Sequence, residues 1–181
     1  RLFLRFEGAN QITNLLINGK MVGEHRGGYG AFVFEITDRV NYGKDNTLLV
    51  RVNNAETLDI MPLVGDFNFY GGIYRPVHLI TTQQLCISPL DYASSGVYLT
   101  QNKVTEQQAD VTATIALSNA EEQAAEATLK IRVLDGKKVV TETERTVRVE
   151  GPQSRWHRCR SPSRNRISGT ARQILSSTAL R

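Results

Sequence analysis

The apolar residues of this chain recur at every second position, in short runs separated by turn-forming residues. Val111, Ala113, Ile115 and Leu117 alternate with more polar neighbours, and residues 127–134 repeat the same period. A period of two places alternate side chains on opposite faces of a β-strand. No stretch carries the long 3.6-residue period of an amphipathic helix, so the sequence predicts an all-β fold.

An Asn-Gly pair gives the strongest local hairpin signal in the chain. Asn18-Gly19 separates two apolar runs, residues 14–17 and 20–23. Asn and Gly both accept the positive φ angles of a type I′ turn, so this pair predicts a tight hairpin. Many short strands joined by turns favour a sandwich or jelly roll. The other predicted strands cover residues 1–6, 32–36, 47–52, 77–80, 97–101, 110–118, 127–134 and 139–149.

The strand pattern divides into two parts. Residues 1–88 predict one sandwich, which opens in mid-strand without an initiator Met or a signal peptide. We therefore expect it to be truncated at its N-terminus. Residues 89–154 predict a smaller β unit with four strands, fewer than the roughly seven of an immunoglobulin-like sandwich. We expect this second unit to be incomplete as well.

The excess of positive over negative charge comes from the C-terminal segment. The net charge is +4, but all 18 acidic residues and only 15 of the 22 basic ones lie in residues 1–154. Residues 155–181 are rich in Arg and Ser and show no periodicity, so we expect a basic, disordered tail. No apolar run approaches the ~20 residues that span a bilayer. We expect neither a nucleic-acid partner nor a membrane partner, and we expect Cys86 to be a small core residue.

Several motifs follow one another in the first half of the chain. Residues 66–77 read Asp-Phe-Asn-Phe-Tyr-Gly-Gly-Ile-Tyr-Arg-Pro-Val. This segment resembles the end of the sugar-binding domain of glycoside hydrolase family 2, β-galactosidase-like enzymes. Residues 22–29 and 34–38 resemble the preceding motifs in order and spacing. The resemblance implies a jelly-roll (galactose-binding-like) sandwich over residues 1–88. It implies a partial immunoglobulin-like β-sandwich after it.

The resemblance also implies a function. Family 2 enzymes hydrolyse terminal β-glycosidic bonds with two glutamates on a TIM barrel, which lies C-terminal to the segment that this chain resembles. We therefore expect a non-catalytic part of a retaining glycosidase, with carbohydrate as partner and no catalytic residue in this chain. A β-galactoside is the first expected substrate, with β-glucuronide and β-mannoside as alternatives. We expect the parent to be bacterial, cytoplasmic or periplasmic. A stand-alone carbohydrate-binding or interaction module is the other function class.

Asp66 is the one predicted substrate-binding residue, and only in the intact parent. The resemblance implies that this Asp hydrogen-bonds the sugar, near an alkali-metal site in some members. A carboxylate suits that role because it accepts two charge-assisted hydrogen bonds. Turn capping after Gly65 is the alternative. Phe67, Phe69 and Tyr70 predict either an aromatic wall for a sugar or packing, of which we favour packing.

No other residue predicts chemistry. Glu7, Glu24 and Glu35 fit solvent-facing strand positions, His25 fits an ordered loop, and His78 fits a packing or surface position in a strand. We expect no metal site and no cofactor in this chain, although the resemblance implies Mg or Na in the parent.

The tail predicts a reading-frame error near Ser154. When residues 155–181 are read out of frame, permitted codons give the string V-A-S-V-P-F-T-I-E-K-P-H-L-W-N-G-K-A-D-P-F-L-Y-R. This string resembles the end of the family's immunoglobulin-like domain. A purposeful basic nucleic-acid arm is the alternative.

The coding nucleotide sequence tests this interpretation. We expect the shifted frame to encode the Leu-Trp-Asn-Gly string and to continue into a barrel. Sequencing the DNA across the codon of Ser154 and downstream measures it. Stop codons in the shifted frame would contradict the frame shift and favour the basic arm.

Overall fold

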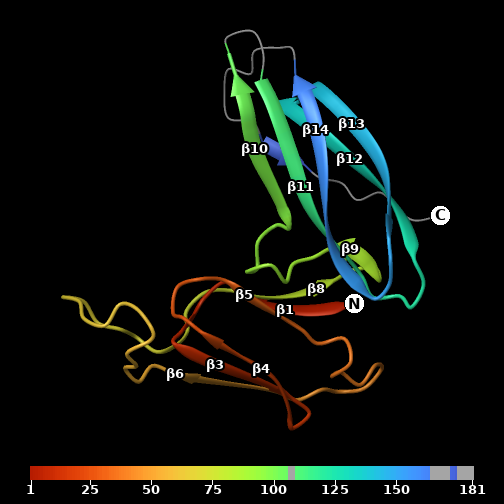
Figure 1. The fold of residues 1–181 in the computed structure, drawn as a ribbon. Helices are drawn as coiled ribbons and strands as arrows, with labels where there is room; N and C mark the ends of the chain where they lie inside the picture. Colours follow the sequence, from red (N-terminus) through yellow and green to blue (C-terminus); the bar gives the residue numbers. More distant parts are fainter. Residues whose placement is uncertain (106–108, 164–171, 175–181) are drawn as a thin grey trace. The chain divides into compact units, whose positions relative to one another are not determined.

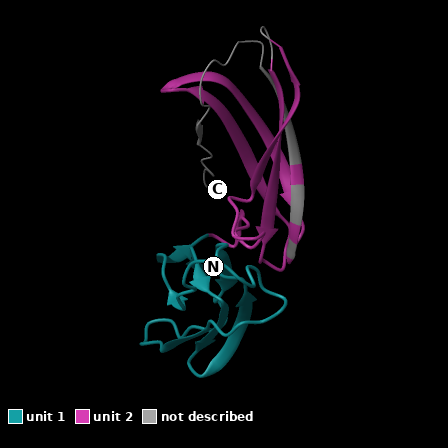
Figure 2. Ribbon diagram, turned by 90° about the vertical axis from the view of Figure 1, so that its left-hand side faces the viewer, with its two compact units in different colours: residues 1–82 teal, residues 83–181 magenta. Residues whose placement is uncertain are grey.

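A computed structural model describes residues 1–105, 109–163 and 172–174, which form two compact units. The units comprise residues 1–82 and 83–181 (Figure 2). Every regular element among the described residues is a strand, which confirms the predicted all-β fold. No helix in these ranges is long and apolar enough to cross a membrane. The boundary after residue 82 differs from the expected one after residue 88, because β9 (Leu85–Ile87) pairs with a strand of the second unit.

Unit 1 contains eight strands in antiparallel sheets (Figure 1). One three-stranded sheet has the order β5–β1–β8, and a second has the order β4–β3–β6. The short strands β2 and β7 pair with each other. The bounds are β1 Leu2–Phe6, β2 Ala9–Asn10, β3 Ile12–Ile17, β4 Lys20–Arg26, β5 Phe32–Glu35, β6 Leu48–Asn53, β7 Gly72–Ile73 and β8 Val77–Thr81.

The predicted Asn-Gly hairpin joins β3 to β4. Asn18 and Gly19 have φ angles of 52° and 77°, so both central residues lie in the left-handed region. Two positive φ angles are the geometry of a type I′ turn, which matches the right-handed twist of the flanking strands. The prediction of this hairpin is confirmed. β4 continues to Arg26, three residues beyond the predicted strand, and this extension carries His25 and Arg26 toward the candidate site.

The core of unit 1 packs its two three-stranded sheets against each other. Phe6 is 1% exposed and stacks on Phe32, with ring centroids 4.8 Å apart. Leu15 and Ile17 on β3 are fully buried opposite them. Their spacing is the period of two that the sequence shows. Burying an aromatic side chain of this size contributes on the order of 1.5–3 kcal/mol.

Unit 2 contains two sheets, also antiparallel. β10, β11 and β14 form one sheet, with β9 pairing beside β10 on the same strand β11, and β13–β12–β15 form the other. The predicted strands over residues 97–101, 110–118, 127–134 and 139–149 all appear, with longer bounds. These bounds are β10 Val97–Val104, β11 Ala109–Asn119, β12 Ala125–Asp135, β13 Lys138–Val149, β14 Gln153–Ser163 and β15 Arg172–Ile174.

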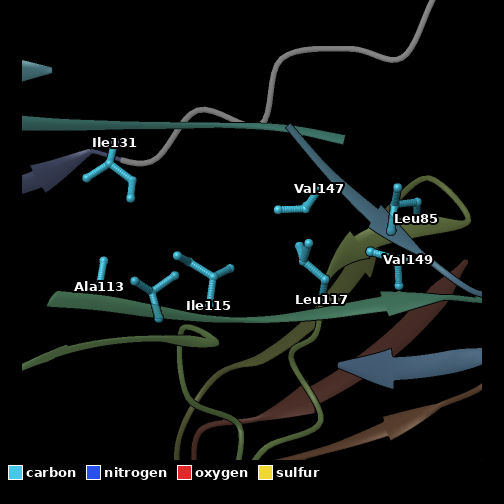
Figure 3. Packing of buried hydrophobic residues seen from close by; sticks show 8 residues of the cluster. Leu85, Ala113, Ile115, Leu117, Ile131, Val147 and Val149 are labelled. Carbon is cyan, nitrogen blue, oxygen red and sulfur yellow. The ribbon is translucent and has the colours of Figure 1, made fainter. Parts of the chain in front are cut away.

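Alternate residues of β11 form the core of unit 2. Ala113, Ile115 and Leu117 point to the side of β11 on which Ile131 of β12 and Val147 and Val149 of β13 lie (Figure 3). Ile115 and Val149 are 1% and 0% exposed. The period of two that predicted this strand is therefore the pattern of its buried face.

The structure differs from the expected disorder of residues 155–181 in the first part of that segment. β14 covers residues 153–163 and pairs with β11 at every position from Asn119 to Ala109. Backbone groups make these hydrogen bonds, so a segment without an apolar period can still form a strand beside a long, otherwise unpaired edge. Of the remainder, residues 172–174 form β15, while residues 164–171 and 175–181 lie outside the described residues.

Candidate functional site

Asp66 lies on a long loop, residues 54–71, between β6 and β7; we call it the Asp66 loop. It contains no strand or helix. Loops longer than about 12–15 residues without regular structure are uncommon and are usually functional. Two side-chain amides close its base. Asn54 Nδ2 donates to Phe69 O at 3.2 Å, and Asn10 Nδ2 donates to Tyr70 O at 2.8 Å.

Asn10 is a buried polar residue that the sequence analysis missed. Its side chain is 4% exposed, and its Oδ1 has no hydrogen-bond partner among the described residues. A Cβ atom at Gly28 would overlap this oxygen, so only glycine fits at that position. The Gly28 carbonyl in turn accepts a hydrogen bond from the Tyr74 hydroxyl at 2.6 Å. The Gly27-Gly28 pair was the signal of a close approach that could have located the site.

Asp66 itself is exposed, and no described residue donates a hydrogen bond to its carboxylate. The carboxylate therefore does not cap the turn after Gly65 in this structure. Gly65 instead contacts the rings of Phe67 and Phe69, because the position of its Cβ would lie 3.0 Å and 3.2 Å from them. This packing leaves the Asp66 oxygens open to solvent.

The three aromatic residues beside Asp66 divide between packing and exposure. The Phe67 and Phe69 ring centroids lie 4.9 Å apart at 54°, and Phe69 is half-buried. Tyr70 is 76% exposed and its hydroxyl accepts a hydrogen bond from Asn68 Nδ2 at 3.2 Å. The Phe67–Phe69 pair therefore shapes the loop, and the Tyr70 ring faces solvent.

An ion pair joins the Asp66 loop to β4. Arg26 Nε and Nη2 donate to the Asp59 carboxylate at 2.8–3.1 Å. These hydrogen bonds from Arg26 hold the pKa of Asp59 below its ordinary value, and the same contacts raise the pKa of Arg26. Both groups are therefore charged at neutral pH. Next to Asp59, Ile60 is 5% exposed, so this part of the loop also carries a buried apolar side chain.

An arginine lies beside each of Glu7, Glu24 and Glu35. Arg1 Nε and Nη2 each donate at 2.8 Å to Glu35, and Arg5 Nε donates at 2.7 Å to Glu7. The arginine hydrogen bonds lower the pKa of both carboxyl groups. Glu24 accepts from Asn14 Nδ2 at 2.7 Å and lies 3.5 Å from Arg26. The carboxyl groups of Glu7 and Glu35, whose pKa is lowered in this way, are poorly suited to act as general acids.

His25 and His78 have different surroundings. The His25 ring stacks on Phe32 with centroids 4.0 Å apart, and burial lowers the pKa of this imidazole. His78 on β8 is half-exposed, with Nε2 3.8 Å from the Glu7 carboxylate. Neither ring adjoins Asp66 in sequence, and the described partners of the two rings are Phe32 and Glu7. His25 therefore supports the turn at Gly27 from inside the sandwich.

No group of three or more His, Cys, Asp or Glu residues in the described ranges is placed to hold a metal ion. Asp66 supplies one carboxylate, whereas Mg²⁺ requires six oxygen ligands in near-octahedral geometry. The described residues alone therefore do not form a complete Mg site. The expectation of Mg or Na in the parent remains a prediction.

The comparisons with known proteins concern the same segment. The family model "Glycosyl hydrolases family 2, sugar binding domain" matches residues 1–83. A β-glucuronidase of Bacteroides fragilis is 62% identical over 149 residues, and a β-galactosidase of Thermoanaerobacter pseudethanolicus is 34% identical over 125 residues. These matches cover 81% and 67% of this chain. The chain spans about a fifth of their lengths, 21% and 16%.

A solved structure shares the fold. The β-glucuronidase of Bacteroides uniformis superimposes with a TM-score of 0.85 at 30% sequence identity. The superposition covers 91% of this chain and 20% of that protein.

Because Gly28 lies close to Asn10, we expect any side chain at position 28 to destabilise the fold. We expect Gly28→Ala to lower the free energy of unfolding by about 1–3 kcal/mol, because the new methyl group displaces the Asn10 amide from Tyr70 O. Urea titration followed by circular dichroism measures the change. Gly30→Ala is the matched control, since its Cβ would meet no atom within 4 Å. Equal destabilisation by the two substitutions would contradict the predicted role of this contact.

Proposed function

Because the chain belongs to glycoside hydrolase family 2, we propose that it is the non-catalytic, substrate-framing part of a glycosidase that cleaves terminal β-glycosidic bonds. The match of the sugar-binding domain to residues 1–83 carries this proposal. The relatives are named for activity on β-glucuronides and β-galactosides. Carbohydrate is therefore the proposed partner of the intact protein.

The arrangement of carboxylates supports a non-catalytic role. Retaining hydrolysis needs two carboxyl groups about 5–5.5 Å apart, one of them protonated at the start of the reaction. Glu7 and Glu35 are instead each bound by arginine in their charged form. Asp66 stands without a carboxylate partner among the described residues.

Asp66 is the proposed sugar ligand in the intact protein. Its carboxylate is exposed and accepts no hydrogen bond from any described residue, so both oxygens are free for sugar hydroxyls. A charge-assisted hydrogen bond of this kind is roughly twice as strong as a neutral one.

The substrate class is a β-glucuronide or a β-galactoside. The B. fragilis relative, 62% identical, is named a β-glucuronidase, and this favours the glucuronide over the galactoside expected from the motifs. The 34% identical relative is named a β-galactosidase, which keeps the galactoside as the second substrate to test.

A stand-alone carbohydrate-binding module is the second candidate. The exposed rings of Tyr70 and Phe67, 76% and 58% exposed, favour it, since an aromatic face beside a carboxylate suits a sugar ring. Binding without hydrolysis by the purified chain would separate this candidate from the first.

We expect the purified chain to hydrolyse neither nitrophenyl β-glucuronide nor nitrophenyl β-galactoside. The physical reason is that its described glutamates lack the geometry of a retaining pair. Release of nitrophenol measures turnover, and an intact family 2 β-glucuronidase is the positive control. Turnover that is lost on substituting Glu7 or Glu35 would overturn the non-catalytic assignment.

In a longer protein that carries this segment and its catalytic barrel, we expect Asp66→Asn to raise KM about 10-fold or more. The amide keeps the size of the side chain and removes one charge-assisted hydrogen bond, worth about 1.5–3 kcal/mol. Steady-state kinetics with both glycosides measures it. Asp45→Asn, on a loop between β5 and β6, is the matched control. Unchanged kinetics for Asp66→Asn would remove this residue from the sugar site.

A further inference from the structure

We propose that Arg26 is a positioning residue that holds the Asp66 loop in a single arrangement through Asp59. The proposal deepens the proposed function, because the loop that it fixes carries the proposed sugar ligand. Arg26 is the last residue of β4, with Ile12 as its Cα partner on β3. It therefore stands on a paired strand, at the point where the sandwich meets the loop.

The contact between Arg26 and Asp59 has the fork geometry specific to arginine. Arg26 Nε lies 3.1 Å from Asp59 Oδ2, and Arg26 Nη2 lies 3.0 Å from Oδ1 and 2.8 Å from Oδ2. Two parallel N–H groups of one guanidinium thus engage both carboxylate oxygens. Such a pair fixes direction as well as distance, which a lysine ammonium cannot reproduce.

The guanidinium is also held from its other side. Arg26 Nη1 lies 3.5 Å from Glu24 Oε1, and Glu24 Oε2 accepts a hydrogen bond from Asn14 Nδ2 at 2.7 Å. Glu24 and Arg26 are two positions apart on β4 and so share one face of the strand. The network Asn14–Glu24–Arg26–Asp59 runs from two paired strands into the loop. Its strand members are held by the pairing of β3 with β4 and by contacts with one another, so Arg26 is preorganised for Asp59.

The Arg26–Asp59 ion pair, which we call the tether, holds the half of the Asp66 loop that the two amides at the base of the loop do not contact. Asn10 and Asn54 bind the carbonyls of residues 69 and 70, near the end of the loop. The first half exposes large apolar side chains, with Leu58 92% and Met61 71% exposed. Little apolar burial holds that half apart from Ile60, which is next to Asp59. The ion pair and Ile60 together therefore decide where the chain enters the turn that carries Asp66.

Amide hydrogen exchange in the 181-residue chain tests the tether directly. We expect Arg26→Ala and Asp59→Asn each to speed exchange of residues 57–64 by about two- to fivefold, the range for an exposed ion pair. The double variant should show no further increase, because both changes remove one contact. Exchange in β11, in the other unit, should stay unchanged. Arg51→Ala on β6 is the matched control, which removes a charge from a neighbouring exposed strand position.

Two further variants distinguish the paired hydrogen bonds of Arg26 from a simple attraction between opposite charges. One keeps the charge of residue 26, and the other swaps the charges of residues 26 and 59. Arg26→Lys should restore less than half of the lost protection, because an ammonium keeps the charge but not the paired N–H groups. The swapped double variant, Arg26→Asp with Asp59→Arg, should restore more protection than either single variant. Loop exchange that equals that of the Arg51→Ala control in both Arg26→Ala and Asp59→Asn would overturn the proposal.

Kinetics in a longer, barrel-containing protein then connects the tether to the sugar. We expect Arg26→Ala to raise KM about two- to fivefold with kcat little changed, since a looser loop binds sugar less well before chemistry begins. If Asp66→Asn raises KM but Arg26→Ala does not, the positioning role is wrong. If neither substitution alters KM while loop exchange still rises, the tether stands and the proposed sugar contact of Asp66 is what fails.

Discussion

The buried side-chain amide of Asn10 is the interaction on which the candidate site depends most. Asn10 lies on the two-residue strand β2, and its side-chain amide donates a hydrogen bond to the backbone carbonyl of Tyr70. A partly buried hydrogen bond of this kind has a modest net value of about 0.5–1.5 kcal/mol, but leaving a buried partner unpaired costs about 1–3 kcal/mol. The close approach of Gly28 fixes the amide in turn. The end of the Asp66 loop is therefore positioned by the Asn10 amide, and Gly28 leaves room for that amide.

The loop combines a fixed base with an exposed, charged and aromatic surface. Its base is tied by main-chain pairing of β2 with β7 and by two side-chain amides, while its carboxylate at Asp66 has no described partner. Asp66, the proposed sugar ligand, is left without a described partner, whereas the main-chain groups at the base of the loop are paired. This division between paired and unpaired polar atoms is typical of preorganised binding sites.

Most of the fold could be predicted from the sequence, because period-two alternation records which face of a strand is buried. β11 and the Asn18-Gly19 turn are examples in which a local pattern and the observed geometry coincide. Asn10 could not be found in this way, because its role depends on Gly28 and Tyr70, which approach it only in the folded chain. β14 escaped prediction for a different reason: its partner β11 supplies the ordering, and its own residues carry no alternation.

The pairing of β14 with β11 has a consequence for how this unit tolerates change. Main-chain hydrogen bonds use backbone N–H and C=O groups, and only proline lacks one of them, the N–H. The pairing with β11 therefore places few requirements on the side chains of residues 153–163. The demanding positions lie on β11, where Ile115 and Leu117 are 1% and 2% exposed. Evolution can therefore change the sequence of β14 more freely than that of β11, because the buried residues of β11 maintain the fold of the unit.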